Sequence, residues 1–181
     1  MGKRVAAGQA PKILLTGPVQ IGKRTVIDRA LTRLPLTVGG IRTRRVPAGG
    51  DRSTYVLEDV MTGMTVEFAR GDAGGVTVDV NVFETTGVEA VRRSREEAEL
   101  TLLDELGRME LDAKRFQRTV FTVLEGPRGV LGVVKAERNP FLDAVRRAAT
   151  VEVFEVRREN RDRLVDVVVE RMSGLRRERP A

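Results

Sequence analysis

The fold is decided by the stretch Ile13-Leu14-Leu15-Thr16-Gly17-Pro18-Val19-Gln20-Ile21-Gly22-Lys23-Arg24-Thr25. An apolar run leads into two glycines and a lysine, and the helical pattern Val26-Ile27-Asp28-Arg29-Ala30-Leu31 follows. This order predicts a strand, a phosphate-binding loop and a helix. Backbone N–H groups of such a loop point to one place, where the helix dipole adds positive potential. Gly17 and Gly22 allow the backbone to approach phosphate oxygens, and Lys23 would reach the terminal phosphates.

The loop departs from the general phosphate-binding pattern at one position. The glycines and Lys23 have the expected spacing, but Arg24 stands where a hydroxyl for Mg²⁺ is expected. Thr25 brings a hydroxyl one residue later, about 100° further around a helix, so it does not simply replace that ligand. The alternative interpretation of this stretch alone is a Gly-rich turn before an ordinary helix.

Length and composition limit the class of protein. The chain has 181 residues, which suits one domain with a sizeable core. No apolar run approaches the roughly 20 residues of a membrane span, and the N-terminus lacks the apolar region of a secretory signal. We therefore expect a cytoplasmic protein that does not enter a membrane.

The absence of two residue types excludes several kinds of site. With no cysteine, the chain has neither a disulfide framework nor a thiolate metal site. With no histidine, it has no His-activated nucleophile and no His-ligated zinc. Acid–base chemistry must therefore use carboxylates, lysine, tyrosine or water.

The net charge of +6 favours phosphate-bearing partners, either nucleotides or nucleic acid. Aromatic residues are scarce, with one Tyr, six Phe and no Trp, so few side chains are available to stack on single-stranded bases. Nucleic-acid binding thus rests on charge alone, and a solvated Arg/Glu-rich surface explains the same charge.

We divide the chain into a flexible N-terminus (1–11), one domain (12–174) and a basic C-terminal tail (175–181). In the middle of the domain, short β-favouring runs alternate with turn signals and predict an antiparallel meander. Its expected strands are Val38–Val46, Thr54–Val60, Met64–Ala69 and Val76–Phe83, and the pattern becomes helical from Glu84.

A second informative stretch is Leu100-Thr101-Leu102-Leu103-Asp104-Glu105-Leu106-Gly107-Arg108-Met109-Glu110. It predicts an apolar strand that ends in two carboxylates, at the edge where open α/β sheets bind their ligands. Alone, Asp104-Glu105 reads more simply as a cap that opens the next turn. After a phosphate-binding loop, a metal ligand and a residue that polarises water become the better interpretation.

Helices and strands then alternate to the end of the domain. We expect helices at Asp112–Leu124, Phe141–Ala148 and from Glu159 to about Gly174, and strands at Val130–Val134 and Val151–Val156.

Three motifs together resemble the small P-loop nucleoside triphosphatases of the thermophilic/cancer-related NTPase type. They agree in order and spacing over about residues 12–173, and the acidic run is the most specific. The motifs are Leu15-Thr16-Gly17-Pro18 with Gly22-Lys23, then Leu103-Asp104-Glu105-Leu106-Gly107-Arg108-Met109-Glu110, then Val153-Phe154-Glu155-Val156 with Glu159-Asn160-Arg161.

The resemblance implies a single three-layer α/β domain of the RecA-like P-loop class, with a mostly parallel central sheet and an antiparallel β meander insertion. It implies Mg²⁺-dependent hydrolysis of nucleoside triphosphates such as ATP or GTP, slow and with broad base preference. Such chemistry needs positioning and charge neutralisation more than a covalent nucleophile.

The resemblance also implies roles for individual residues. Lys23, Asp104 and Glu105 would be catalytic, with Asp104 and Thr25 on the metal and Glu105 on the attacking water. Arg108, which lies inside the acidic run after the strand, is our own candidate for a catalytic source of positive charge. Lys135 and Arg138 are further candidates for that charge. The nucleotide-binding residues would be Gly17, Pro18, Val19, Gln20, Ile21, Gly22, Lys23, Arg24, Thr25, Asn160 and Arg161.

The loop differs from the family pattern, which has a third glycine at Gln20 and threonines at Arg24 and Thr25. Gln20 would restrict the loop, while Arg24 removes a metal ligand and would partly stand in for the metal's charge. Two alternatives to hydrolysis therefore stay open: a degenerate nucleotide-binding sensor with little turnover, and a small-molecule or nucleotide kinase.

Overall fold

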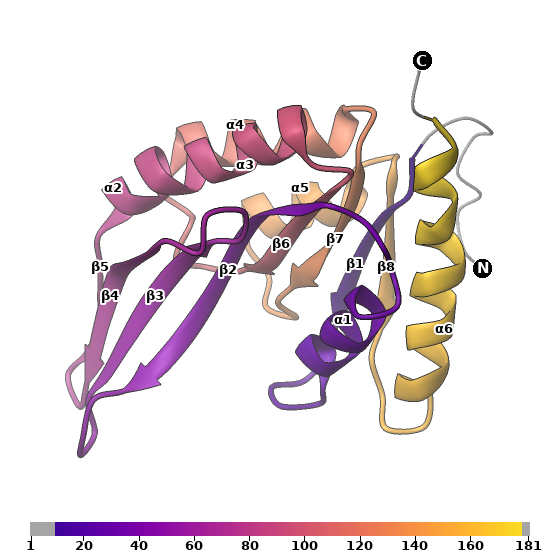
Figure 1. Cartoon of the computed structure of the whole chain (residues 1–181). Helices are drawn as coiled ribbons and strands as arrows, with labels where there is room; N and C mark the ends of the chain where they lie inside the picture. Colours follow the sequence, from indigo (N-terminus) through magenta and orange to yellow (C-terminus); the bar gives the residue numbers. More distant parts are fainter. Residues whose placement is uncertain (1–9, 179–181) are drawn as a thin grey trace.

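The computed structural model describes residues 10–178, so most of the expected flexible N-terminus and the last three residues of the expected tail lie outside the described residues. The chain forms an eight-stranded sheet with helices on both faces (Figure 1). The strands are β1 Lys12–Thr16, β2 Val38–Pro47, β3 Ser53–Asp59, β4 Thr65–Asp72, β5 Gly75–Val78, β6 Leu100–Leu106, β7 Gly129–Val134 and β8 Val151–Glu155.

The helices follow the strands in the alternation expected for an α/β domain. Short turns extend two of them: a π-helical segment, Phe83–Gly87, joins α2 to α3, and a 3₁₀ helix, Ser173–Glu178, follows α6. The helices are α1 Lys23–Leu31, α2 Val80–Val82, α3 Val88–Glu97, α4 Lys114–Glu125, α5 Pro140–Arg147 and α6 Arg161–Met172. In the described part of the chain, none is long and apolar enough to cross a membrane.

The sheet has the order β5-β4-β3-β2-β6-β7-β1-β8 and is parallel from β2 to β8. The three-layer α/β fold with a mostly parallel sheet is therefore confirmed. Since parallel strands share one carboxyl edge, the loops after β1, β6 and β7 open on the same side of the molecule. β7 lies between β1 and β6, so the glycine loop and the acidic pair face each other across one strand.

The antiparallel meander continues this sheet through β2. That strand pairs in parallel with β6 on one side and antiparallel with β3 on the other, and β4 and β5 complete the sheet. The predicted strand Val76–Phe83 is wrong in its second half: β5 ends at Val78 and a helix begins at Val80. Asp79 caps that helix by accepting a hydrogen bond from the Asn81 N–H. The strand was predicted to continue because valine alternates through the start of this helix.

Two apolar cores hold the layers together. Helices α3, α4 and α5 cover one face, where Phe83 and Phe116 are fully buried. Helices α1 and α6 cover the other face. Along α6, the buried side chains are Leu164, Val165, Val168 and Met172. Leu175 also packs against this second core, so the start of the expected tail is attached to the domain.

A glycine sets the close approach of β2 and β6. Gly40 has φ +106°, and a Cβ built there would lie 2.1 Å from the backbone oxygen of Leu102. No other residue fits this position without moving a strand. Two residues further along, the same pairing places Arg42 opposite Asp104, so Gly40 also determines the geometry at the edge of the sheet.

We expect Gly40→Ala to lower the free energy of unfolding by about 2–3 kcal/mol or more, because the new Cβ meets backbone atoms in a strained conformation. Urea denaturation would measure the loss. Gly49→Ala is the matched control, since Gly49 has φ +86° but nothing within 4 Å of its built Cβ. If both variants lost the same free energy of unfolding, the contact between the new Cβ and the Leu102 backbone would contribute nothing beyond the strain of a positive φ.

The turn after β6 is closed by a buried carboxyl group. The Glu110 side chain is 3% exposed and accepts a 2.9 Å hydrogen bond from the Gly107 N–H. Burial raises the pKa of Glu110 from its ordinary 4.5 to about 7. The folded protein therefore holds this proton over a pH range in which the unfolded chain has released it.

This difference makes stability depend on pH. As the pH rises from about 4.5 to 7, the Glu110 contribution to the free energy of unfolding should fall, by up to about 3 kcal/mol. Glu110→Gln keeps the acceptor and cannot ionise, so its stability relative to the wild type should rise over that range. Urea denaturation at pH 5, 6, 7 and 8 would measure this, with exposed Glu89→Gln as the control. A difference from the wild type that does not vary with pH would contradict the assignment.

Candidate functional site

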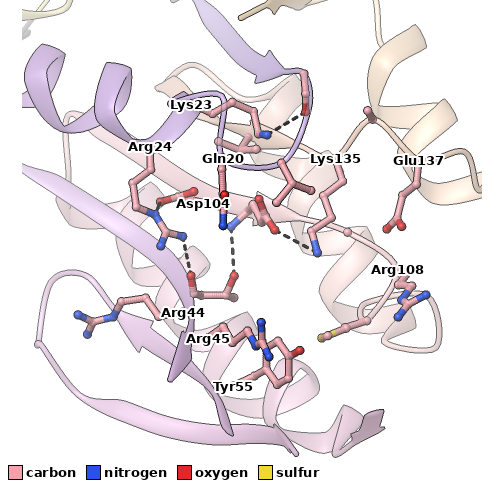
Figure 2. Close-up of a pocket in the computed structure, with 18 of the residues that line it drawn as sticks. Gln20, Lys23, Arg24, Arg44, Arg45, Tyr55, Asp104, Arg108, Lys135 and Glu137 are labelled. Atoms are coloured by element: carbon pink, nitrogen blue, oxygen red, sulfur yellow. Dashed lines mark hydrogen bonds and ion pairs between the residues drawn. The ribbon is translucent and has the colours of Figure 1, made fainter. Parts of the chain in front are cut away.

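An open cleft of about 870 Å³ lies at the carboxyl edge of the sheet. Its walls come from the glycine loop, from the ends of β6 and β7, and from β2 and β3 of the meander (Figure 2). The charged side chains that line it are Lys23, Arg24, Arg44, Arg45, Asp104, Glu105, Arg108, Glu110, Lys135 and Glu137.

The glycine loop curls between β1 and α1 as the sequence predicts. Gly17 has φ +136° and Gly22 has φ +104°, and a Cβ at either position would lie 2.8 Å from its nearest neighbour. Gln20 also has a positive φ, of 61°. Gln20 thus adopts a left-handed conformation that side chains disfavour, at a cost of about 1–2 kcal/mol.

Lys23, at the first position of α1, is held inside the loop. Its Nζ donates hydrogen bonds of 2.9 Å to the Gly17 oxygen and 2.7 Å to the Pro18 oxygen. Burial lowers the pKa of Lys23, while the neighbouring carboxylate of Glu105 raises it. The ammonium group thus links the helix start to the first residues of the loop.

Asp104 binds two arginines. Its side chain is 1% exposed, and its Oδ2 lies 2.9 Å from the Nε of Arg24 and 3.4 Å from the Nε of Arg42. Arg24 also donates a 2.7 Å hydrogen bond to the Thr43 oxygen on β2, so it joins α1, β2 and β6. Burial raises the pKa of Asp104, and the charge and hydrogen bond of Arg24 oppose that shift.

These contacts bear on Mg²⁺, for which Asp104 and Thr25 are the candidate ligands. The Oδ2 of Asp104 is taken by the two guanidinium groups, and Thr25 is exposed at the cleft wall. Across residues 10–178, no group of three or more Asp or Glu side chains could hold a metal ion by itself. Mg²⁺ at a nucleotide needs only one or two protein ligands beside the phosphates, but two guanidinium groups already pair with the Asp104 carboxylate. The side chains of the cleft therefore do not form a preformed Mg²⁺ site, and the metal assignment stays a prediction.

Glu105 faces the cleft in an ion pair. Its Oε1 lies 3.1 Å from the Nζ of Lys135, and both side chains are partly exposed (Figure 2). Lys135 follows β7, and its aliphatic part crosses Gly107, where a built Cβ would lie 3.1 Å from the Lys135 Cδ. The acidic strand and the neighbouring strand thus deliver opposite charges to the same point.

The other predicted cations separate into two groups. Arg108 is exposed at the wall of the cleft. Arg138 is 79% exposed, pairs with Asp143 at 2.7 Å and does not line the cleft. Arg93 and Arg157 pair with Asp59 and Glu155 and also lie outside the cleft.

Asn160 and Arg161 lie behind the loop and do not line the cleft. Asn160 accepts from the Arg157 N–H at 2.8 Å and donates to the Glu155 oxygen at 2.9 Å, which closes the turn before α6. The side chain of Arg161 packs across Gly22. Arg161 therefore supports the glycine loop, while Asn160 orders the turn before α6.

Sequence reasoning missed the contribution of β2 and β3 to the cleft. Arg42, Arg44, Arg45 and Tyr55 were assigned only to the meander, yet the first pairs with Asp104 and the other three line the cleft. The available signal was the three arginines at positions 42, 44 and 45, which make β2 strongly basic. It could not be used because the parallel pairing of β2 with β6 was not foreseen.

Comparison with known proteins finds a matching family model and several related sequences. A family model described as NTPase matches residues 12–169. A nucleoside-triphosphatase THEP1 from Thermococcus kodakarensis is 33% identical over 181 residues, covering 92% of this chain and 99% of the relative. Another, from Methanothermobacter thermautotrophicus, is 34% identical over 161 residues, covering 84% of this chain and 91% of the relative.

A solved structure has the same fold. The crystal structure of THEP1 from Aquifex aeolicus matches with a TM-score of 0.74 at 24% sequence identity, covering 88% of this chain and 97% of that chain. With the family model, which spans nearly the whole domain, these matches confirm the resemblance seen in the sequence motifs. The chain belongs to the NTPase family of P-loop proteins.

Proposed function

We propose that this protein hydrolyses nucleoside triphosphates to diphosphate and phosphate in the cleft. The observation that carries the proposal is the convergence of Lys23, Asp104, Glu105 and Lys135 beside a glycine loop at one edge of the sheet. Phosphoryl transfer to water needs a phosphate cradle, charge neutralisation and an oriented nucleophile, all of which these residues can supply without histidine or cysteine. The relatives named nucleoside-triphosphatase support the same activity.

The loop would bind the phosphates. The backbone N–H groups of the loop, which every residue of 17–24 except Pro18 carries, and the N-terminus of α1 offer donors and positive potential to the β- and γ-phosphates. Lys23 now gives its hydrogen bonds to the carbonyls of Gly17 and Pro18, and we assign it to the terminal phosphates in the bound state. Arg161 would help to keep Gly22 in place from behind.

Glu105 would orient and polarise the attacking water. Its carboxylate lies in the cleft and is held by Lys135, so it is fixed without being buried. Arg108 would neutralise charge that develops on the transferred group, since it is the exposed arginine that follows the acidic strand. Glu105 would act from β6, and Arg108 would act from the turn that follows this strand.

P-loop proteins of this kind generally use Mg²⁺, which would bring positive charge to the triphosphate. In this chain Asp104 would be the protein carboxylate closest to such an ion, and two arginines already hold it. We therefore assign the roles above to side chains alone. Slow turnover, broad base preference and a cytoplasmic location belong to the same proposal as expectations from the family resemblance.

The second candidate function is a sensor that binds nucleotide but hydrolyses little of it. The observation that favours it is Arg24, which pairs with Asp104 and occupies the position of the expected hydroxyl. A nucleic-acid partner has weaker support, because several arginines of the basic surface are in ion pairs with Asp or Glu.

We expect Lys23→Ala and Glu105→Gln each to reduce phosphate release at least about a hundredfold, because each removes charge or water positioning needed in the transition state. The assay would follow phosphate from a panel of nucleoside triphosphates with Mg²⁺ present. Lys114→Ala and Glu89→Gln, both exposed and outside the cleft, are the matched controls.

Turnover that survives both cleft variants would refute hydrolysis at this site. No turnover in the wild type, together with nucleotide binding that Lys23→Ala weakens, would move the conclusion to the sensor function.

Arg108→Ala should lower kcat at least about tenfold with little change in KM, because the side chain would act mainly on charge that appears in the transition state. Steady-state kinetics would measure both constants. Arg138→Ala is the control, since Arg138 is also exposed but pairs with Asp143 away from the cleft. Equal kinetics in the two variants would exclude Arg108 from the reaction.

A further inference from the structure

We infer that Arg24 supplies the positive charge at the phosphates that a bound Mg²⁺ would otherwise bring, so that this protein binds nucleoside triphosphates without a divalent metal. The inference rests on the proposed function and identifies the form of substrate that the cleft accepts. It starts from the place of Arg24, directly after the loop lysine, at the position where the family pattern has a metal-binding hydroxyl.

Asp104 does not offer a free site for a cation. Its Oδ2 holds Arg24 at 2.9 Å and Arg42 at 3.4 Å, and the side chain is almost fully buried. A dication bound here would meet two guanidinium charges in a poorly solvated place, where like charges repel strongly. The pairing of Arg24 with Asp104 therefore opposes metal binding at this carboxylate.

Arg24 has donors to spare for a phosphate. A guanidinium group has five N–H bonds, and Arg24 uses one on Asp104 and one on the Thr43 oxygen. Within the described residues its other N–H bonds have no hydrogen-bond partner. The side chain is 41% exposed and lines the cleft beside the loop (Figure 2). Such a planar group can bind phosphate oxygens in pairs, as a point charge cannot.

The surrounding charges allow Arg24 to turn toward a phosphate. Arg42 pairs with Asp28 at 2.7 Å as well as with Asp104, so the cluster contains two acids and two arginines. If Arg24 shifts its hydrogen bonds to an anion, Arg42 still faces Asp104. The buried carboxylate is then not left without a counter-charge, which would otherwise oppose the movement.

Isothermal titration of the full chain with AMP-PNP, a non-hydrolysable ATP analogue, tests the inference. We expect the wild-type Kd in EDTA to lie within about threefold of the Kd with Mg²⁺. Arg24→Thr restores the hydroxyl of the family pattern, and its affinity in EDTA should fall at least about tenfold and recover with Mg²⁺. Arg24→Lys keeps the charge without the fork, so we expect intermediate binding in EDTA.

Arg29→Gln is the matched control, because Arg29 lies on the same helix and also pairs with an aspartate, Asp162, away from the cleft. Its binding should equal that of the wild type under both conditions. Circular dichroism would check that each variant is folded. If Arg24→Thr does not fold, the affinity of Arg24→Lys in EDTA tests the inference instead.

Each outcome decides the question. Wild-type binding that needs Mg²⁺, or Arg24→Thr and Arg24→Lys variants that bind in EDTA like the wild type, would overturn the inference and leave nucleotide hydrolysis standing. A wild type that binds AMP-PNP neither in EDTA nor with Mg²⁺ would overturn both the inference and the proposed function.

Discussion

The carboxylate of Asp104 and the two arginines that bind it join the three segments around which the cleft is built. Arg24 comes from the start of α1, Arg42 from β2 and Asp104 from β6. A buried carboxylate without partners would be strongly unfavourable, so these contacts are required once Asp104 is placed inside the sheet. They also bind the glycine loop to the meander, which β1 does not touch directly. The charge cluster therefore fixes the distance between the phosphate-binding loop and the far wall of the cleft.

The sheet explains why these groups meet. β7 separates β1 from β6, which leaves room at the carboxyl edge for a ligand between the loop and the acidic pair. The pairing of β6 with β7 is irregular between Leu103 and Leu106, and Asp104 and Glu105 lie in that interval. One of them pairs with Arg24 and Arg42, while the other pairs with Lys135 at the cleft. Two neighbouring carboxylates thus receive different surroundings and can perform different tasks.

The sequence predicted the elements with local signals and missed those that depend on pairing. The apolar run before Gly17 and the helical stripe after Lys23 are local, and both were confirmed. The end of β5 was missed because the alternating valines continue into a segment where Asp79 caps a helix. The contact between Arg42 and Asp104 depends on the register of β2 against β6, which no pattern within either strand encodes. The charged residues of the glycine loop could be named from the motif, but their partners could not.

The glycine loop is curled, although two of its positions differ from the family pattern. Its shape comes from contacts within the chain: Lys23 binds the carbonyls of Gly17 and Pro18, and Arg161 packs across Gly22. These contacts offset the unfavourable φ of Gln20. A loop that is already ordered loses little conformational entropy when an anion binds, which favours affinity. Against this, the hydrogen bonds of Lys23 to two carbonyls compete with bonds to phosphate, whereas Arg24 has further N–H bonds to offer. Affinity therefore depends on how well a triphosphate replaces the two carbonyls at Lys23.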